Sequence, residues 1–184
     1  MTRTTLAARS LASALLIAWG WVALAVAAIA PLGGCAGPFV GPRAEALRIS
    51  ELERVGTARH QASMDLVVEG LDAELGSSPQ RARGRYERAI QIDPSNAFAY
   101  LALSRYYAAL GDSGRALQHL ERAESLLDPG APVYRSVEPH LLGLRGWALA
   151  AAGRTAQADP LLADARRLAP SVWGDGRLEA SELR

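Results

Sequence analysis

Residues 97–129 read AFAYLALSRYYAALGDSGRALQHLERAESLLDP, and this stretch decides the fold. Residues three and four positions apart lie above one another on a helix of about 3.6 residues per turn. The spacing therefore predicts two apolar helical faces separated by a turn at Gly111 and Asp112. The first face is formed by Tyr100, Leu103, Ser104 and Tyr107, and the second by Ala116, Leu120 and Ala123. Both faces must be buried, so we expect two antiparallel helices.

This spacing resembles the tetratricopeptide repeat, a helix-turn-helix unit with a repeat length of about 34 residues. The family pattern begins Trp-x2-Leu-Gly-x2-Tyr, continues with Ala and an aromatic residue, and closes with Pro. The matching positions here are Tyr100, Leu103, Ser104, Tyr107, Ala116, Leu120 and, one position late, Pro129.

The alanine stripe recurs along the chain. Ala82 and Ala89 precede Ala116 and Ala123 by one repeat length, and Ala158 and Ala165 follow them after one repeat length and a short insertion. We therefore expect repeat copies at residues 63–96, 97–130 and 139–172, with the insertion at 131–138 and Pro139 in the first turn of the third copy. About three copies are needed to bury a continuous core. An ordinary helical bundle with coincidental spacing is the alternative.

The resemblance implies an all-α, right-handed α-solenoid of about three units. Residues 43–62 should supply an amphipathic helix and a connection that cover the open end of the stack. Residues 173–184 should form a polar cap or tail, because terminal repeats need a soluble outer face.

Residues 1–34 have the pattern of a signal peptide. Arg3 and Arg9 precede an uncharged run from Leu11 to Ala30, a positive start followed by an apolar segment. The run is also long enough for a membrane-spanning helix, which needs about 20 apolar residues. An uncleaved inner-membrane anchor is therefore the alternative.

Cys35 is the single cysteine of the chain, and the stretch Leu32-Gly33-Gly34-Cys35 resembles a bacterial lipobox. The resemblance implies cleavage before Cys35 and acylation of its thiol and new amino group. Residues 35–42 would then be the acylated cysteine and a tether. Several acyl chains on one residue anchor a protein stably, whereas one chain binds marginally.

Composition excludes several classes of function. The net charge of +1 argues against nucleic-acid binding. The three histidines have no partners at metal-ligand spacing, and no glycine-rich phosphate loop occurs. The stretch Gly111-Asp112-Ser113-Gly114 resembles the nucleophile loop of trypsin-like serine proteases, but it falls on a predicted turn. We therefore expect no catalytic site, no metal, no cofactor and no small-molecule substrate.

The family resemblance implies that the first helix of each copy lines a concave groove for a protein or peptide partner. Phe98 and Trp147 would receive partner side chains, and Arg105, a lone arginine at the middle, would bind a carboxylate or a backbone carbonyl. The alternative is that Phe98 and Trp147 simply pack against the neighbouring helix or the insertion. The predicted groove residues are Met64, Val67, Leu71, Phe98, Leu101, Arg105, His140 and Trp147, with Gly143 on the same face.

Together these features predict a lipoprotein scaffold or adaptor in a bacterial cell envelope, on the periplasmic face of the outer membrane. The alternatives are an inner-membrane anchor presenting the same repeats, and an enzyme with an unrecognised site in the insertion.

Overall fold

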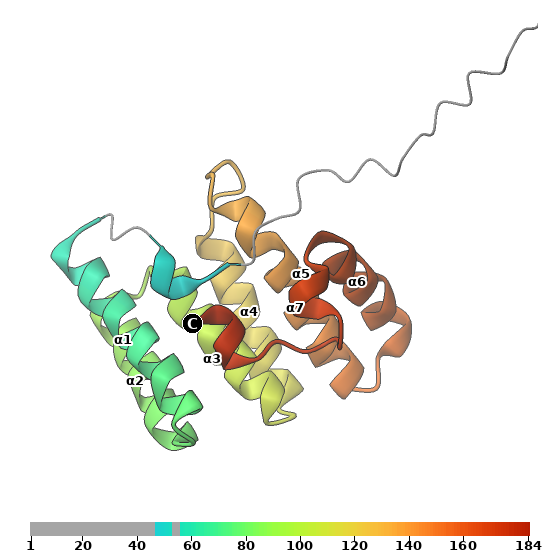
Figure 1. Cartoon of the computed structure of the whole chain (residues 1–184), viewed down its shortest axis with the longest axis horizontal. Helices are drawn as coiled ribbons and strands as arrows, with labels where there is room; N and C mark the ends of the chain where they lie inside the picture. Colours follow the sequence, from blue (N-terminus) through green and yellow to red (C-terminus); the bar gives the residue numbers. More distant parts are fainter. Residues whose placement is uncertain (1–46, 53–55) are drawn as a thin grey trace, which may run out of the picture. The chain divides into compact units, whose positions relative to one another are not determined.

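The computed structural model describes residues 47–52 and 56–184, which all fall within one compact unit. Every regular element in these ranges is a helix (Figure 1). The order is η1 (Ile49–Glu51), α1 (Ala58–Leu75), α2 (Pro79–Ile92), α3 (Ala97–Ala109), α4 (Ser113–Leu126), α5 (Tyr134–Ala151), α6 (Thr155–Leu168), α7 (Pro170–Trp173) and α8 (Ala180–Leu183). The predicted signal segment, Cys35 and the tether lie outside the described residues.

Helices α1 to α6 pack as three sequential antiparallel pairs, α1 with α2, α3 with α4, and α5 with α6 (Figure 1). Neighbouring pairs then contact one another through α2 and α3, α4 and α5, and the first helices of each pair. The prediction of an all-α chain of paired helices is confirmed. Across the two described ranges, no helix combines the length and the apolarity that a membrane crossing requires.

The alanine stripes hold each pair together because they let two helices approach closely. Both alanines of the stripe are fully buried in all three pairs: Ala82 and Ala89, Ala116 and Ala123, Ala158 and Ala165. A second close approach supports the stripe. A Cβ added to Gly70 would overlap the Tyr86 ring, and one added to Gly146 would lie 2.8 Å from Leu162. Ser104 occupies the equivalent position of the middle pair and is also buried.

Capping residues end and restart the helices where the sequence indicates. Gly111 has φ +74°, a left-handed conformation suited to glycine at a helix C-terminus. The carboxylate of Asp112 then accepts a hydrogen bond from the Arg115 backbone N–H at 3.0 Å and caps α4. The protease-like stretch is therefore an ordinary inter-helix turn with a cap.

The first helix of the third pair begins earlier than its predicted repeat copy. Helices α1 and α5 have 18 residues, whereas α3 has 13. Helix α5 begins at Tyr134, inside the predicted insertion, so Pro139 lies within the helix and not in its first turn. Val137 is fully buried and Tyr134 packs against the core, which explains why the helix starts early.

The flanking segments also differ from the prediction. In the described part of residues 43–62 before α1, only the short turn η1 is helical, and Arg48 and Leu52 on either side of it are extended. Leu47 and Ile49 are buried, and η1 contacts α1. The prediction of a continuous amphipathic helix is thus wrong for the described residues, although the segment does cover apolar surface.

Residues 170–184, here called the return segment, do not form the predicted cap on the outside of the last pair. The segment leaves α6, runs across the first helices of the pairs and ends with α8 packed against α1 (Figure 1). Its apolar side chains are buried, namely Val172, Trp173, Leu178, Ala180 and Leu183. Burial of these side chains explains why the segment folds back onto the stack.

Candidate protein-binding surface

The predicted groove residues lie on the first helices of the three pairs, as expected, but most are covered. Val67 and Leu71 on α1 and Leu101 on α3 are fully or almost fully buried, with Met64 at 9% exposure. Phe98 and Trp147 are half-buried and pack against the core. The expectation of an open groove is wrong, because the return segment and η1 occupy this face.

Arg105 is paired within the chain, whereas the sequence suggested that it would bind a partner. Its side chain is 3% exposed, and its Nη2 donates to a carboxylate oxygen of Glu74 on α1. The same carboxylate accepts a hydrogen bond from the Tyr86 hydroxyl of α2 at 2.6 Å. Burial, followed by the charge of Glu74, raises the pKa of Tyr86 above its usual range, so the hydroxyl stays protonated and remains a donor. Three helices therefore meet at one buried ion pair.

A further contact connects Arg105 to the return segment. Its Nη1 donates to the backbone carbonyl of Leu178 at 3.4 Å. At the end of the segment, the Ser50 hydroxyl donates to the carbonyl of Arg184, and the Arg184 guanidinium pairs with Asp72. The segment is thus attached to α3, α1 and η1 by polar as well as apolar contacts.

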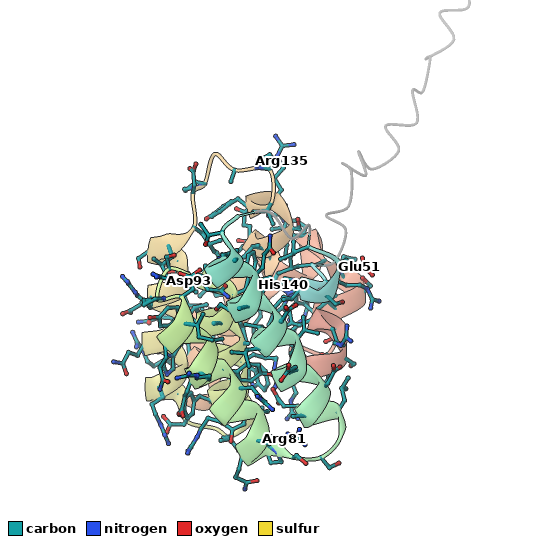
Figure 2. All side chains as sticks on the ribbon, turned by 90° about the vertical axis from the view of Figure 1, so that its left-hand side faces the viewer. Glu51, Arg81, Asp93, Arg135 and His140 are labelled. Atoms are coloured by element: carbon teal, nitrogen blue, oxygen red, sulfur yellow. The ribbon has the colours of Figure 1, made fainter. Side chains whose placement is uncertain are left out.

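His140 lies in the interior of the stack, whereas Arg135, earlier on the same helix, lies at the exposed end of α5 (Figure 2). The His140 ring centroid is 6.3 Å from that of Trp173. Burial alone lowers the pKa of His140 to about 4, so its ring is neutral at physiological pH. Within residues 47–52 and 56–184, neither ring nitrogen has a hydrogen-bond partner.

Gly143 provides the site for the Trp173 ring. A Cβ added at Gly143 would overlap the indole at Cε2, well inside van der Waals contact. The indole is fully buried. The absence of a side chain on α5 therefore makes a slot that fits an aromatic ring from the return segment.

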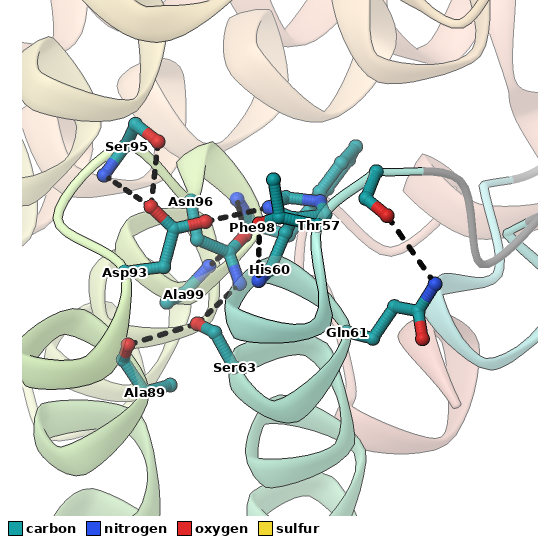
Figure 3. A network of polar contacts seen from close by, with 11 residues as sticks. Thr57, His60, Gln61, Ser63, Ala89, Asp93, Ser95, Asn96, Phe98 and Ala99 are labelled. Carbon is teal, nitrogen blue, oxygen red and sulfur yellow. Dashed lines mark hydrogen bonds and ion pairs between the residues drawn. The ribbon is translucent and has the colours of Figure 1, made fainter.

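A polar network fixes α1 against the start of α3 at one end of this surface (Figure 3). His60 Nδ1 on α1 lies 2.6 Å from Asp93 Oδ2, and Asp93 Oδ1 accepts the backbone and hydroxyl hydrogens of Ser95. Burial opposes the ionisation of Asp93, but the hydrogen bonds from Ser95 and His60 outweigh it and lower its pKa.

Asn96 completes the network from the other side. Its Oδ1 accepts the Phe98 backbone N–H at 3.0 Å and caps α3. Its Nδ2 donates to the Ser63 hydroxyl on α1 at 2.8 Å, which in turn donates to the Ala89 carbonyl at 2.8 Å (Figure 3). One side chain thus both starts α3 and joins it to the first pair.

The return segment is the structural feature of this surface that sequence reasoning missed. The signals were present in the sequence. Trp173, Leu178 and Leu183 are large apolar residues in a short polar stretch, and Gly143 falls at a predicted concave position. Each signal is weak alone, because only the tertiary fold brings position 143 next to position 173.

Among curated proteins, none matches the chain. Residues 86–118 match the model of a family described as tetratricopeptide repeat. The matched stretch runs from the second half of α2 through α3 into α4, across the junction of the first two helix pairs. The function that this repeat suggests is that of a protein–protein interaction scaffold.

Proposed function

We propose that the chain is a lipid-anchored scaffold of the bacterial cell envelope, which binds a protein partner on the concave surface formed by α1, α3 and α5. The observation that carries the scaffold function is the repeated helix pair, with its buried alanine stripe in all three copies and its family match at residues 86–118. Stacked pairs of this kind create extended concave surfaces for partners.

The anchor is proposed from the sequence. The single cysteine follows the long uncharged run and the small residues Gly33 and Gly34. Acyl chains on Cys35 would hold the helical unit at a membrane surface, with residues 35–42 as the acylated cysteine and tether. Periplasmic exposure on the outer membrane is part of the same proposal.

Mass spectrometry of the amino terminus tests the anchor. The chain is expressed with residues 1–34 in a diderm bacterium and extracted from membranes with detergent. We expect the extracted chain to begin with an acylated Cys35. We expect a Cys35→Ser variant to keep residues 1–34. An intact Met1 with a free thiol in the unmodified chain would instead support an uncleaved anchor.

Photo-crosslinking tests the partner surface in cells. A photoreactive amino acid is placed at Trp147, at the half-buried edge of the concave surface, and separately at Arg83, which is exposed on α2. We expect a discrete cross-linked partner from position 147 and none from position 83. Equal cross-linking from both positions would contradict the assigned surface.

A further inference from the structure

The return segment is held by the surface that the proposed partner would use. Trp173, Leu178 and Leu183 are all fully buried there. Helices α7 and α8 have four residues each, and Gly176 between them has φ +80°. The segment is therefore two single-turn helices joined by an irregular stretch, and it lies across the first helices of the pairs in the manner of a bound peptide ligand.

The Trp173 slot is specific for a large flat side chain. Its floor is the backbone of α5 at Gly143, and the ring approaches this position more closely than any side chain would permit. A groove with such a slot recognises an aromatic anchor, the kind of residue that contributes most to protein interfaces.

Within the described part of the chain, the return segment leaves some buried polar groups beneath it, and its own indole nitrogen, without a hydrogen-bond partner. Both ring nitrogens of His140, Nε of Arg105 and Nε1 of Trp173 are buried without a partner in the described ranges. A buried donor that lacks an acceptor raises the free energy of the state that buries it. The segment is consequently an imperfect ligand for this surface.

The acidic side chains of the segment bond within the segment itself. Asp175 accepts the backbone N–H of Arg177 at 2.9 Å. Glu179 and Glu182 form a reciprocal capping box around α8. No carboxylate of the segment, all of which the structure describes, bonds to His140 or to Nε of Arg105.

From these observations we infer that the return segment is a displaceable intramolecular ligand. The partner that replaces it presents an aromatic anchor for the Gly143 slot and a carboxylate that accepts a hydrogen bond from His140. This inference rests on the proposed function, since it names the chemistry of the partner at the same surface. Release of the segment is then a condition for partner binding.

A peptide with the sequence of residues 170–184 tests the inference on the full chain. An attached segment has an effective concentration on the order of millimolar, so the free peptide competes poorly with it in the unmodified chain. A Trp173→Ala chain loses its own anchor but keeps the Gly143 slot. We expect this chain to bind the peptide at least about tenfold more tightly than the unmodified chain does.

Two controls show whether binding uses the Gly143 slot. The same peptide with Ala at the Trp173 position should bind the Trp173→Ala chain without the gain of about tenfold in affinity. A chain carrying both Trp173→Ala and Gly143→Ala should also lose this gain, because the new Cβ fills the slot. The inference is overturned if the Trp173→Ala chain keeps its helical circular dichroism but binds the peptide no more tightly than the unmodified chain does.

Hydrogen exchange on the unmodified chain keeps the inference testable if the Trp173→Ala chain does not fold. We expect the amides of residues 172–184 to exchange through an opening that leaves α3 and α5 protected, at least about tenfold faster than those helices. If the return segment exchanges only when α3 and α5 also exchange, the segment is a permanent part of the core. That result would overturn the inference.

Acidic variants of the peptide test whether the ligand of this surface carries a carboxylate. Each residue of the peptide from position 171 to 177, except Trp173, is replaced in turn by Glu, and Asp175 is moved by one position. We expect at least one variant to bind the Trp173→Ala chain about tenfold more tightly than the parent, and to lose this gain when His140→Leu is added. No gain at any position would overturn the assignment of an acidic ligand. These tests use only the chain and its own peptide, so their outcome is independent of whether an envelope partner is found.

Discussion

Arg105 of α3 and Glu74 of α1 form an ion pair beneath the return segment, with side-chain exposures of 3% and 13%. The Tyr86 hydroxyl of α2 donates to the same carboxylate. Two helix pairs and the return segment thus share one charged centre. A buried charge that loses its partner is strongly destabilising, whereas an exposed pair contributes little.

Replacing Glu74 by Ala should therefore lower the free energy of unfolding by about 3–5 kcal/mol, since it leaves Arg105 buried without a counter-charge. Urea denaturation followed by circular dichroism measures the change. The matched control is Asp164→Ala, which removes the partner of Arg167 in an ion pair with side-chain exposures of 68% and 51%. We expect a loss below about 1 kcal/mol there. Equal losses for the two variants would contradict a stabilising role for the buried pair.

Gly70 should not tolerate a side chain. A Cβ at this position would overlap the Tyr86 ring, so Gly70→Ala forces α1 and α2 apart and should cost about 1–3 kcal/mol. Gly84 on α2 has no atom within 4 Å of an added Cβ, and Gly84→Ala should stabilise the helix by about 1 kcal/mol. Thermal unfolding of both variants checks the contrast. A Gly70→Ala chain as stable as Gly84→Ala would contradict the close packing of the first pair.

The alanine and glycine positions show which part of the fold could be predicted from the sequence. The stripe from Ala82 to Ala165 repeats because the two helices of each pair meet in the same way, and this periodicity is visible in one sequence. The turn at Gly111 depends on local backbone chemistry and was likewise predictable. The paired helices could therefore be predicted without a structure.

The candidate surface was predicted only in part. The positions of Arg105 and His140 on the inner helices followed from the repeat, but their burial did not. The docking of Trp173 against Gly143 joins residues of different elements that belong to no repeated pattern. The early start of α5 similarly depends on the packing of Val137, which no periodic signal predicts. Non-periodic tertiary contacts are the part that sequence reasoning could not supply.

Acid should weaken the fold through His140. Burial lowers the pKa of this side chain to about 4, from 6.5 in an unfolded chain. Between these values the unfolded state binds more protons, so stability is complete above pH 6.5 and falls as the pH drops towards 4. The expected loss is about 3 kcal/mol between pH 7 and pH 4.

Denaturation curves of the unmodified chain and of His140→Leu, recorded at pH 7, 5.5 and 4, isolate this contribution. Leucine cannot ionise, so the difference in stability between the two chains should shift in favour of His140→Leu by about 3 kcal/mol over this interval. Other titrating groups change the stability of both chains equally, so their contributions cancel in the difference. A difference that does not change with pH would show that His140 is solvated in the folded state.

Asn96 gives a prediction about the junction of the first two pairs. Its Oδ1 caps α3 and its Nδ2 donates to Ser63, and the side chain is fully buried. Asn96→Ala removes both interactions and should cost about 1–3 kcal/mol of stability, measured by urea denaturation. Asp112→Ala removes the cap of α4 and a solvent-screened ion pair with Arg115, so its effect should be smaller.

Asn96→Asp separates the two interactions of Asn96. Aspartate keeps the oxygen that caps α3 but cannot donate to Ser63, and it brings a second carboxylate close to Asp93. If the bond to Ser63 matters, Asn96→Asp should remain clearly less stable than the unmodified chain, and protonation at low pH should recover part of the loss. An Asn96→Asp chain as stable as the unmodified one would show that the cap alone fixes α3, and that the contact between the first two pairs is held by apolar packing.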